Sequence, residues 1–226
     1  RWGGYLSFAG VRLDSIRVRQ EHLCNDSCGS RVVVMAPNPT RPGVHVSDPS
    51  GLRAMAHPLR LQLIGSLRVD GPQTVGMLSE RLDAAPGSIS FHLGTLERHG
   101  FVEQAPDLAR DRRERWWRAT AERTTFEPVD LHDDPAQRAA GRAMRQAIVQ
   151  QYAAGQLTYL ETEDTLDPAW IAAATMGDDA MWLTPAQLRE LSDELEALAS
   201  RWHTLGDREA PGAQAVQVIY SAFRRP

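Results

Sequence analysis

The chain has 226 residues, of which 42% are hydrophobic and 24% are charged, and its formal net charge is −4. This composition excludes a disordered or fibrous chain and indicates a soluble globular protein with room for one large or two small domains. No apolar run approaches the roughly 18 residues that a membrane-spanning helix needs.

The charge is distributed unevenly along the chain. Residues 1–49 and 50–119 each carry +2, whereas residues 120–226 carry −8. Because the acidic last segment would repel a polyanion, any contact with nucleic acid is expected in the middle segment.

The first 48 residues show no sustained hydrophobic period, and we predict a disordered leader there. They do not resemble a signal peptide, and Met35 is an alternative start of the biological protein. Cys24 and Cys28 lie beside His22, but a metal site needs a fourth ligand and a fixed scaffold that this segment does not offer. Two cysteines give no disulfide framework, which favours the cytoplasm.

Two short helices are expected next. Asp48 and Pro49 form an N-cap pattern for the first helix, near residues 50–56. Pro58 begins a second helix with an apolar stripe, and this helix ends before Pro72.

The stretch from Thr74 to Val102 is typical of a helix-turn-helix. Two sets of apolar residues recur at spacings of three and four on either side of a break at residues 83–86, which predicts two packed amphipathic helices. Pro86 suits the start of the second helix, which we expect to run to His99 with a cap at Gly100. The apolar sets are Val75, Leu78 and Leu82, and Ile89, Leu93 and Leu96.

The outward face of that second helix carries small, polar and basic side chains. Hydroxyl groups can meet base edges or phosphates in a DNA major groove, and an apolar group can touch a thymine methyl. An ordinary solvated helix is the alternative. The residues of this face are Gly87, Ser88, Ser90, Phe91, Thr95 and Arg98.

A basic hairpin is predicted directly after the helix-turn-helix. Strand candidates at residues 101–104 and 116–120 flank a polar loop. Such a hairpin is a wing, whose arginines can reach the phosphate backbone or the minor groove. A solvated charge run is the alternative, because Asp111 and Glu114 are neighbours. The loop holds Arg110, Arg112, Arg113 and Arg115.

This order of elements resembles the ArsR-like winged helix-turn-helix transcriptional regulators over about residues 50–120. The resemblance is carried by AHPLRL at residues 56–61 and by LDAAPGSISFHLGTLERHGFV at residues 82–102. It implies a DNA-binding domain. Residues 75–82 lack the paired cysteines of the metal-sensing branch, so the chain resembles a non-metal-sensing branch, and no metal or cofactor is predicted.

The resemblance also implies which residues face DNA. It places Ser88, Ser90, Phe91 and His92 on the DNA side of the recognition helix. Phe91 stands where a His is common, so contact with a thymine methyl becomes the alternative to hydrogen bonding. His92 shares the inward sector with Ile89, so it is either packed in the core or in contact with a phosphate.

The C-terminal half is predicted to be an α+β module. A helix is expected from Asp134 to Ala154 and another from Thr184, which forms a capping box with Gln187, to Leu205. Strands are expected at residues 158–163, 180–183 and 215–223. The second helix has a narrow apolar seam that can pack within its own domain or against a second copy. Its residues are Leu188, Leu191, Leu195, Leu198, Trp202 and Leu205.

The predicted fold class is mainly α with small β, an α+β protein. A winged helix-turn-helix DNA-binding domain at residues 49–120 precedes a C-terminal dimerisation or effector-binding module at residues 121–226. An apolar group in the module either lines an effector pocket or is ordinary core. This group is Trp170, Met176, Met181 and Trp182.

The function predicted from the sequence is a cytoplasmic, sequence-specific transcriptional regulator. It would bind double-stranded DNA as a homodimer and repress transcription, under the control of a small organic effector or none, with no membrane contact. One alternative is a winged helix used for protein–protein interaction. The other is an enzyme with an appended winged helix, for which no catalytic motif is visible.

Overall fold

A computed structural model describes residues 43–46, 48–111, 114–126, 131 and 133–225. The chain divides into two units, Arg1–Ala36 and Pro37–Pro226, and all described residues belong to the second unit. Most of the predicted leader, with its cysteines, therefore lies outside the described residues. The described part is mainly helical with two small sheets, which confirms the predicted fold class.

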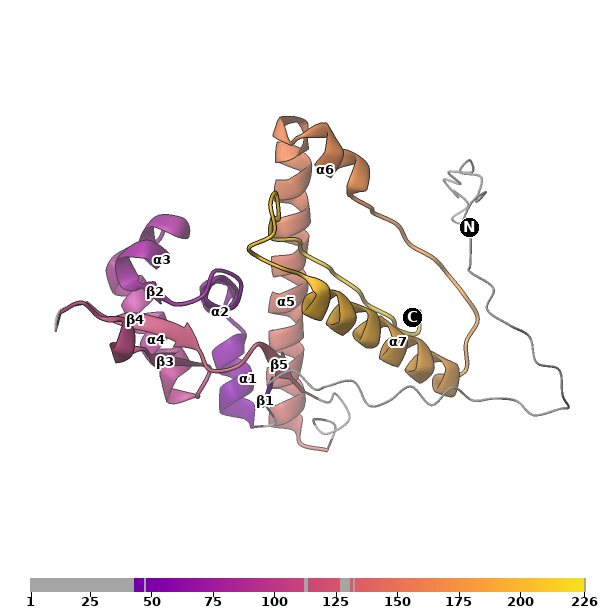
Figure 1. The fold of residues 1–226 in the computed structure, drawn as a ribbon. Helices are drawn as coiled ribbons and strands as arrows, with labels where there is room; N and C mark the ends of the chain where they lie inside the picture. The colour runs from indigo at the N-terminus through magenta and orange to yellow at the C-terminus, as the bar shows by residue number, and fades with distance from the viewer. Residues whose placement is uncertain (1–42, 47, 112–113, 127–130, 132, 226) are drawn as a thin grey trace, which may run out of the picture. The chain divides into compact units, whose positions relative to one another are not determined.

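Four short helices begin the described fold, and each starts at a local signal in the sequence. The side chains of Asp48 and Thr74 accept hydrogen bonds from the first-turn backbone of α1 and α3. The other two helices begin at a proline, which suits a first turn because it needs no N–H there. The helices are α1 (Pro49–Met55), α2 (Pro58–Val69), α3 (Val75–Arg81) and α4 (Pro86–Arg98) (Figure 1).

The predicted hairpin follows α4. Gly100, with φ of +72°, ends the helix, and β3 (Val102–Gln104) then pairs antiparallel with β4 (Trp116–Ala119). A third short strand, β2 (Gln73–Thr74), pairs with the other edge of β4. This pairing ties the start of α3 to the end of β4 that lies next to the hairpin loop.

A second, unpredicted sheet joins two distant segments. Strand β1 (Gly43–His45) pairs parallel with β5 (Arg123–Thr125), and Val46 beside it is 4% exposed within the core. The prediction that the disordered leader extends to residue 48 is therefore wrong for residues 43–46. Strand β1 has only three residues, too few to show a periodicity in the sequence, and its partner β5 lies about eighty residues later in the chain.

One continuous core joins the helix-turn-helix, the sheet and the start of α5 (Pro135–Thr162). The helix α5 packs on α1 and α2 (Figure 1). Its small and apolar side chains Ala140 and Met144 are buried there, together with Leu131. The core therefore includes residues beyond the 49–120 segment that the sequence indicated for the DNA-binding domain.

Helix α5 is longer than predicted. It passes through Gly155 and ends at Thr162, so the expected end at Ala154 and the strand at residues 158–163 are wrong. A single glycine costs a helix only about 1 kcal/mol relative to alanine. No proline follows until Pro168, where α6 (Pro168–Ala173) begins.

The last described helix, α7 (Pro185–Leu205), has the predicted capping box between Thr184 and Gln187. The strands expected at residues 180–183 and 215–223 are absent from this described region. Their apolar and β-branched residues favour extended backbone, but a strand also needs another strand beside it, and neither segment belongs to the two sheets of the described residues. No described helix is long and apolar enough to cross a membrane.

Candidate nucleic-acid interface

The second helix of the helix-turn-helix, α4, has one buried and one open face. Its apolar residues Ile89, Leu93 and Leu96 are fully buried against α2 and α3. Ser90 is exposed, and the ring of Phe91 is 67% exposed. The buried and exposed faces of α4 are therefore those that the periodicity of the sequence predicts.

The polar groups of the open face differ in their freedom to bind. The Thr95 hydroxyl donates to the Phe91 carbonyl at 3.1 Å and accepts from the Arg98 guanidinium at 3.2 Å. The same guanidinium donates to the Gly94 carbonyl at 3.3 Å. Within the described chain the hydroxyls of Ser88 and Ser90 form no such bonds, so they keep both their donor and their acceptor capacity.

The N-terminus of α4 is also open. Its cap residue, Ala85, has no side chain that can accept from the first turn, and no atom lies within 4 Å of the position where Gly87 would carry a Cβ. The unpaired backbone N–H groups of a helix N-terminus carry partial positive charge. Beside the Ser88 hydroxyl, this end of α4 has the polarity that a DNA phosphate requires.

His92 does not belong to the open face. It is 8% exposed, and its ring lies 4.4 Å from the ring of His57, which precedes α2. The edge of the Phe91 ring also meets it, with the ring centres 5.2 Å apart. Of the two alternatives that the sequence left for His92, the structure shows the packed one.

Arg60 of α2 completes this cluster of His57, Arg60 and His92, which we call the histidine cluster. Its guanidinium donates to the carbonyls of Ala54 and Arg53 at the end of α1. One guanidinium nitrogen, Nη1, lies 3.5 Å from Nδ1 of His92. The cluster therefore links α1, α2 and the recognition helix α4.

The histidine cluster favours uncharged imidazoles. Burial lowers the pKa of His92, and the neighbouring His57 and the Arg60 cation lower it further. Burial and Arg60 also lower the pKa of His57. Because a charged imidazole would lose solvation and face a cation, the folded state favours the neutral form of both rings.

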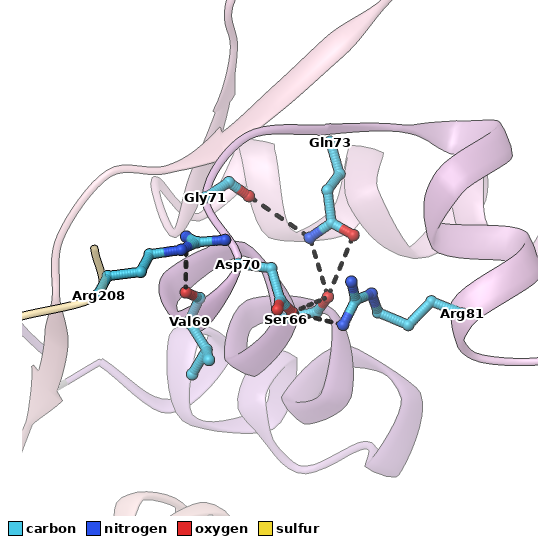
Figure 2. A network of polar contacts seen from close by, with 7 residues as sticks. All are labelled: Ser66, Val69, Asp70, Gly71, Gln73, Arg81 and Arg208. Atoms are coloured by element: carbon cyan, nitrogen blue, oxygen red, sulfur yellow. Dashed lines mark hydrogen bonds and ion pairs between the residues drawn. The ribbon is translucent and has the colours of Figure 1, made fainter. Parts of the chain in front are cut away.

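A polar network holds the first helix of the helix-turn-helix in place (Figure 2). The Gln73 side chain, 2% exposed, donates to Ser66 Oγ at 2.9 Å and to the Gly71 carbonyl at 3.4 Å. Asp70 accepts from the Ser66 hydroxyl at 3.2 Å and forms an ion pair with Arg81 at 2.9 Å. These contacts fix the end of α2 against both ends of α3.

The wing carries two exposed arginines in its described part, Arg110 and Arg115. The predicted Arg112 and Arg113 lie outside the described residues. Arg118, which the sequence did not single out, forms ion pairs with Glu103 at 2.7 Å and Asp107 at 3.3 Å. Ion pairs therefore link the two strands of the wing, while Arg110 and Arg115 in the loop are exposed to solvent.

Sequence reasoning missed the supporting residues of this surface. His57 and Arg60 lie in the AHPLRL segment, which carried the family resemblance without indicating a role for either residue. Gln73 is a polar residue between two predicted helices, and nothing in the sequence marks it as buried. Hydrophobic periodicity finds the packed face of a helix but not the polar side chains that position it.

The predicted effector residues are open to solvent. Their exposed fractions are 38% for Trp170, 65% for Met176, 53% for Met181 and 101% for Trp182. The single chain therefore does not bury them around a ligand, and an effector site there stays a prediction. A shallow depression of about 350 Å³ lies elsewhere, against α3, and is lined by Gln73, Met77, Glu80 and Arg81.

Residues 55–105 match the model of a helix-turn-helix domain family. The chain therefore contains a helix-turn-helix domain, which agrees with the geometry of α3 and α4. No curated protein matches the chain.

Several solved structures show a partial similarity to the chain. Reduced HlyU from Vibrio cholerae is 24% identical with a TM-score of 0.27, and the match covers 43% of this chain and 83% of that one. The transcriptional regulator Tm0710 from Thermotoga maritima is 16% identical with a TM-score of 0.28, over 69% and 87% of the two chains. A mutant of Lactococcus lactis ZitR in its apo form is 14% identical with a TM-score of 0.29, and the match covers 65% of this chain and 83% of that one.

Proposed function

We propose that this chain is a sequence-specific, DNA-binding transcriptional regulator of the ArsR-like type, without a metal sensor. The observation that carries the proposal is the open face of α4, the second helix of the helix-turn-helix, which directly precedes a hairpin with exposed arginines. The face would enter the major groove of double-stranded DNA, and the wing would lie along the phosphate backbone.

The distribution of charge supports this placement. The segment with the helix-turn-helix and the wing carries +2, whereas residues 120–226 carry −8. Arg110 and Arg115 are exposed in the wing, and the N-terminus of α4 adds partial positive charge near Ser88. DNA would therefore be attracted to this face and repelled by the C-terminal half.

We further propose that the regulator acts as a homodimer through its C-terminal half. The second half of α5 leaves Val149, Leu157 and Leu160 more than half exposed, and α7 does the same with Trp202 and Leu205. Apolar surface of this extent is typical of protein interfaces. We propose that a second copy of the chain covers this surface. Such a dimer would also place two recognition helices in two half-sites about one DNA turn apart.

Repression by obstruction of a promoter is the proposed outcome of binding, in the cytoplasm where the DNA lies. A small organic effector is proposed for the C-terminal half, where Trp170 and Trp182 are the residues to test. If these residues pack at the dimer interface, an effector bound there would change the spacing of the two recognition helices.

The test starts from a randomised duplex pool. The full chain should enrich one motif with two related half-sites, and its affinity for that motif should fall steeply with salt. On a log–log plot the slope is about −0.9 for each phosphate neutralised. In the proposed homodimer the double variant Arg110→Ala/Arg115→Ala removes four arginines, so it should reduce the magnitude of the slope by about 4.

The matched control removes two exposed arginines outside the domain, Arg189→Ala/Arg224→Ala. This control has the same change in net charge and should keep the slope of the unmodified chain. If the pool yields no motif, or if both double variants keep the original slope, the chain is not the regulator proposed here.

A further inference from the structure

The open face of α4 contains few groups that can distinguish one base pair from another. Ser88 and Ser90 can donate or accept, so a serine hydroxyl meets either kind of base edge. Thr95 and Arg98 form hydrogen bonds with each other and with the backbone of their own helix. Thr95 has a single hydroxyl, which cannot make a two-point contact with a base, and the Nε and Nη2 bonds of Arg98 tie its guanidinium to α4 itself.

Phe91 is the exception on this face. Two thirds of its side chain is exposed, although a phenylalanine gains most from burial. It lies between Ser90 and the histidine cluster, directly opposite the apolar side of α4 that fills the core. Water is therefore a poor partner for the ring, and an apolar group of the bound partner would be a better one.

The Phe91 ring is also in contact with a buried neighbouring ring. Its edge meets the ring of the buried His92, with centroids 5.2 Å apart and planes at 75°. His92 is held in turn by His57 and Arg60. An aromatic side chain with few torsions, resting on a packed neighbour, loses little conformational entropy when it meets a ligand.

In the major groove only thymine offers a methyl group at its base edge. We propose that Phe91 is the specificity-determining residue of this domain and that it selects thymine by contact with the 5-methyl group. The inference rests on the proposed function, because it requires α4 to enter the major groove. On this proposal α4 recognises its DNA sequence through an apolar contact, and the serines and the wing contribute to affinity.

The experiment uses the motif that the full chain enriches, with thymines replaced one at a time by uracil. This change removes the 5-methyl group and leaves base pairing intact. At one position in each half-site, the replacement should weaken binding by about four-fold, the equivalent of one methyl group left unburied. Both replacements together should weaken binding by about fifteen-fold.

Phe91→Ala should weaken binding to the thymine duplex by a similar factor and should show no further loss on uracil. Phe91→Leu should keep part of the preference for thymine, because it is still apolar. Val69→Ala, which shortens another exposed apolar side chain at the end of α2, should keep the full preference. Because Phe91 is exposed, its variants should unfold at the same temperature as the unmodified chain.

The outcomes separate the two proposals. If a motif is enriched but uracil is tolerated at every position, the thymine contact is refuted while the regulator proposal stands. The same holds if Phe91→Ala still discriminates uracil from thymine. If no motif is enriched from the pool, both proposals are refuted together.

Discussion

At the scale of single residues, the histidine cluster has the clearest energetic consequence. The folded protein lowers the pKa of His92 and His57 from their ordinary value of 6.5, through burial and the nearby Arg60. As the pH falls through 6.5 the unfolded chain binds protons before the folded chain does. The free energy of unfolding therefore decreases, and it levels off once the pH is below the folded pKa.

We predict that the protein is less stable at pH 5.5 than at pH 7.5, and that His92→Gln makes this difference smaller. Urea denaturation at the two pH values measures it. His45→Gln, the same change at an exposed position of β1, should keep the full difference. An identical pH dependence in both variants would show that His92 does not titrate in this range.

At the scale of secondary structure, local signals predicted most of the described elements. Asp48 and Thr184 cap helices where the sequence indicated, and Gly100 ends α4. The errors in the strands share one cause. A strand requires a partner elsewhere in the chain, so β1 was missed and residues 215–223 were misassigned, because neither outcome depends on local sequence.

The candidate site was predictable to a similar extent. The period of α4 placed Ser90 and Phe91 outside and Ile89 inside. The sequence left His92 undecided, because a half-polar ring near the edge of the inward sector can turn either way. His57, more than thirty residues earlier in the chain, provides the contact that holds it inside, and no helical period contains that information.

Helix α5 offers a test of packing at the same scale. A Cβ added at Gly141 would lie 2.5 Å from Leu131 Cδ1, and Leu131 is itself buried, with 2% of its surface exposed. We predict that Gly141→Ala lowers the free energy of unfolding by about 1–3 kcal/mol, because overpacking outweighs the gain in helix propensity. Thermal or urea denaturation measures the change.

Gly65→Ala in α2 is the matched control. No atom lies within 4 Å of the added Cβ there, so this variant should gain about 0.5–1 kcal/mol from helix propensity alone. The two substitutions are chemically identical and should have opposite signs. A stabilised Gly141→Ala would mean that Leu131 is not packed against α5.

At the scale of the whole molecule, the exposed apolar side chains of α7 lead to a prediction about assembly. Leu198 and Trp202 are 46% and 62% exposed. If they meet a second copy, Leu198→Glu/Trp202→Glu should convert a dimer into monomers, because buried unpaired carboxylates are costly. Sedimentation measures the assembly state, and DNA affinity should fall by at least ten-fold as the two half-sites are bound independently.

Arg189→Glu adds a carboxylate at an exposed position near the start of α7, and this control should remain dimeric. If both the double variant and the control remain dimeric, the copies meet through another surface. A chain that is monomeric without any substitution would refute the homodimer altogether.

The shared core has a consequence for how this protein can be divided or recombined. Met144 of α5 is packed in the same core as Leu63 and Leu96 of the helix-turn-helix, so a cut at residue 120 would pass through a single packed interior. The helix-turn-helix and wing therefore cannot be exchanged as an independent domain by a junction at residue 120. A workable junction would have to lie beyond Ile148, the last residue of α5 that packs against this core.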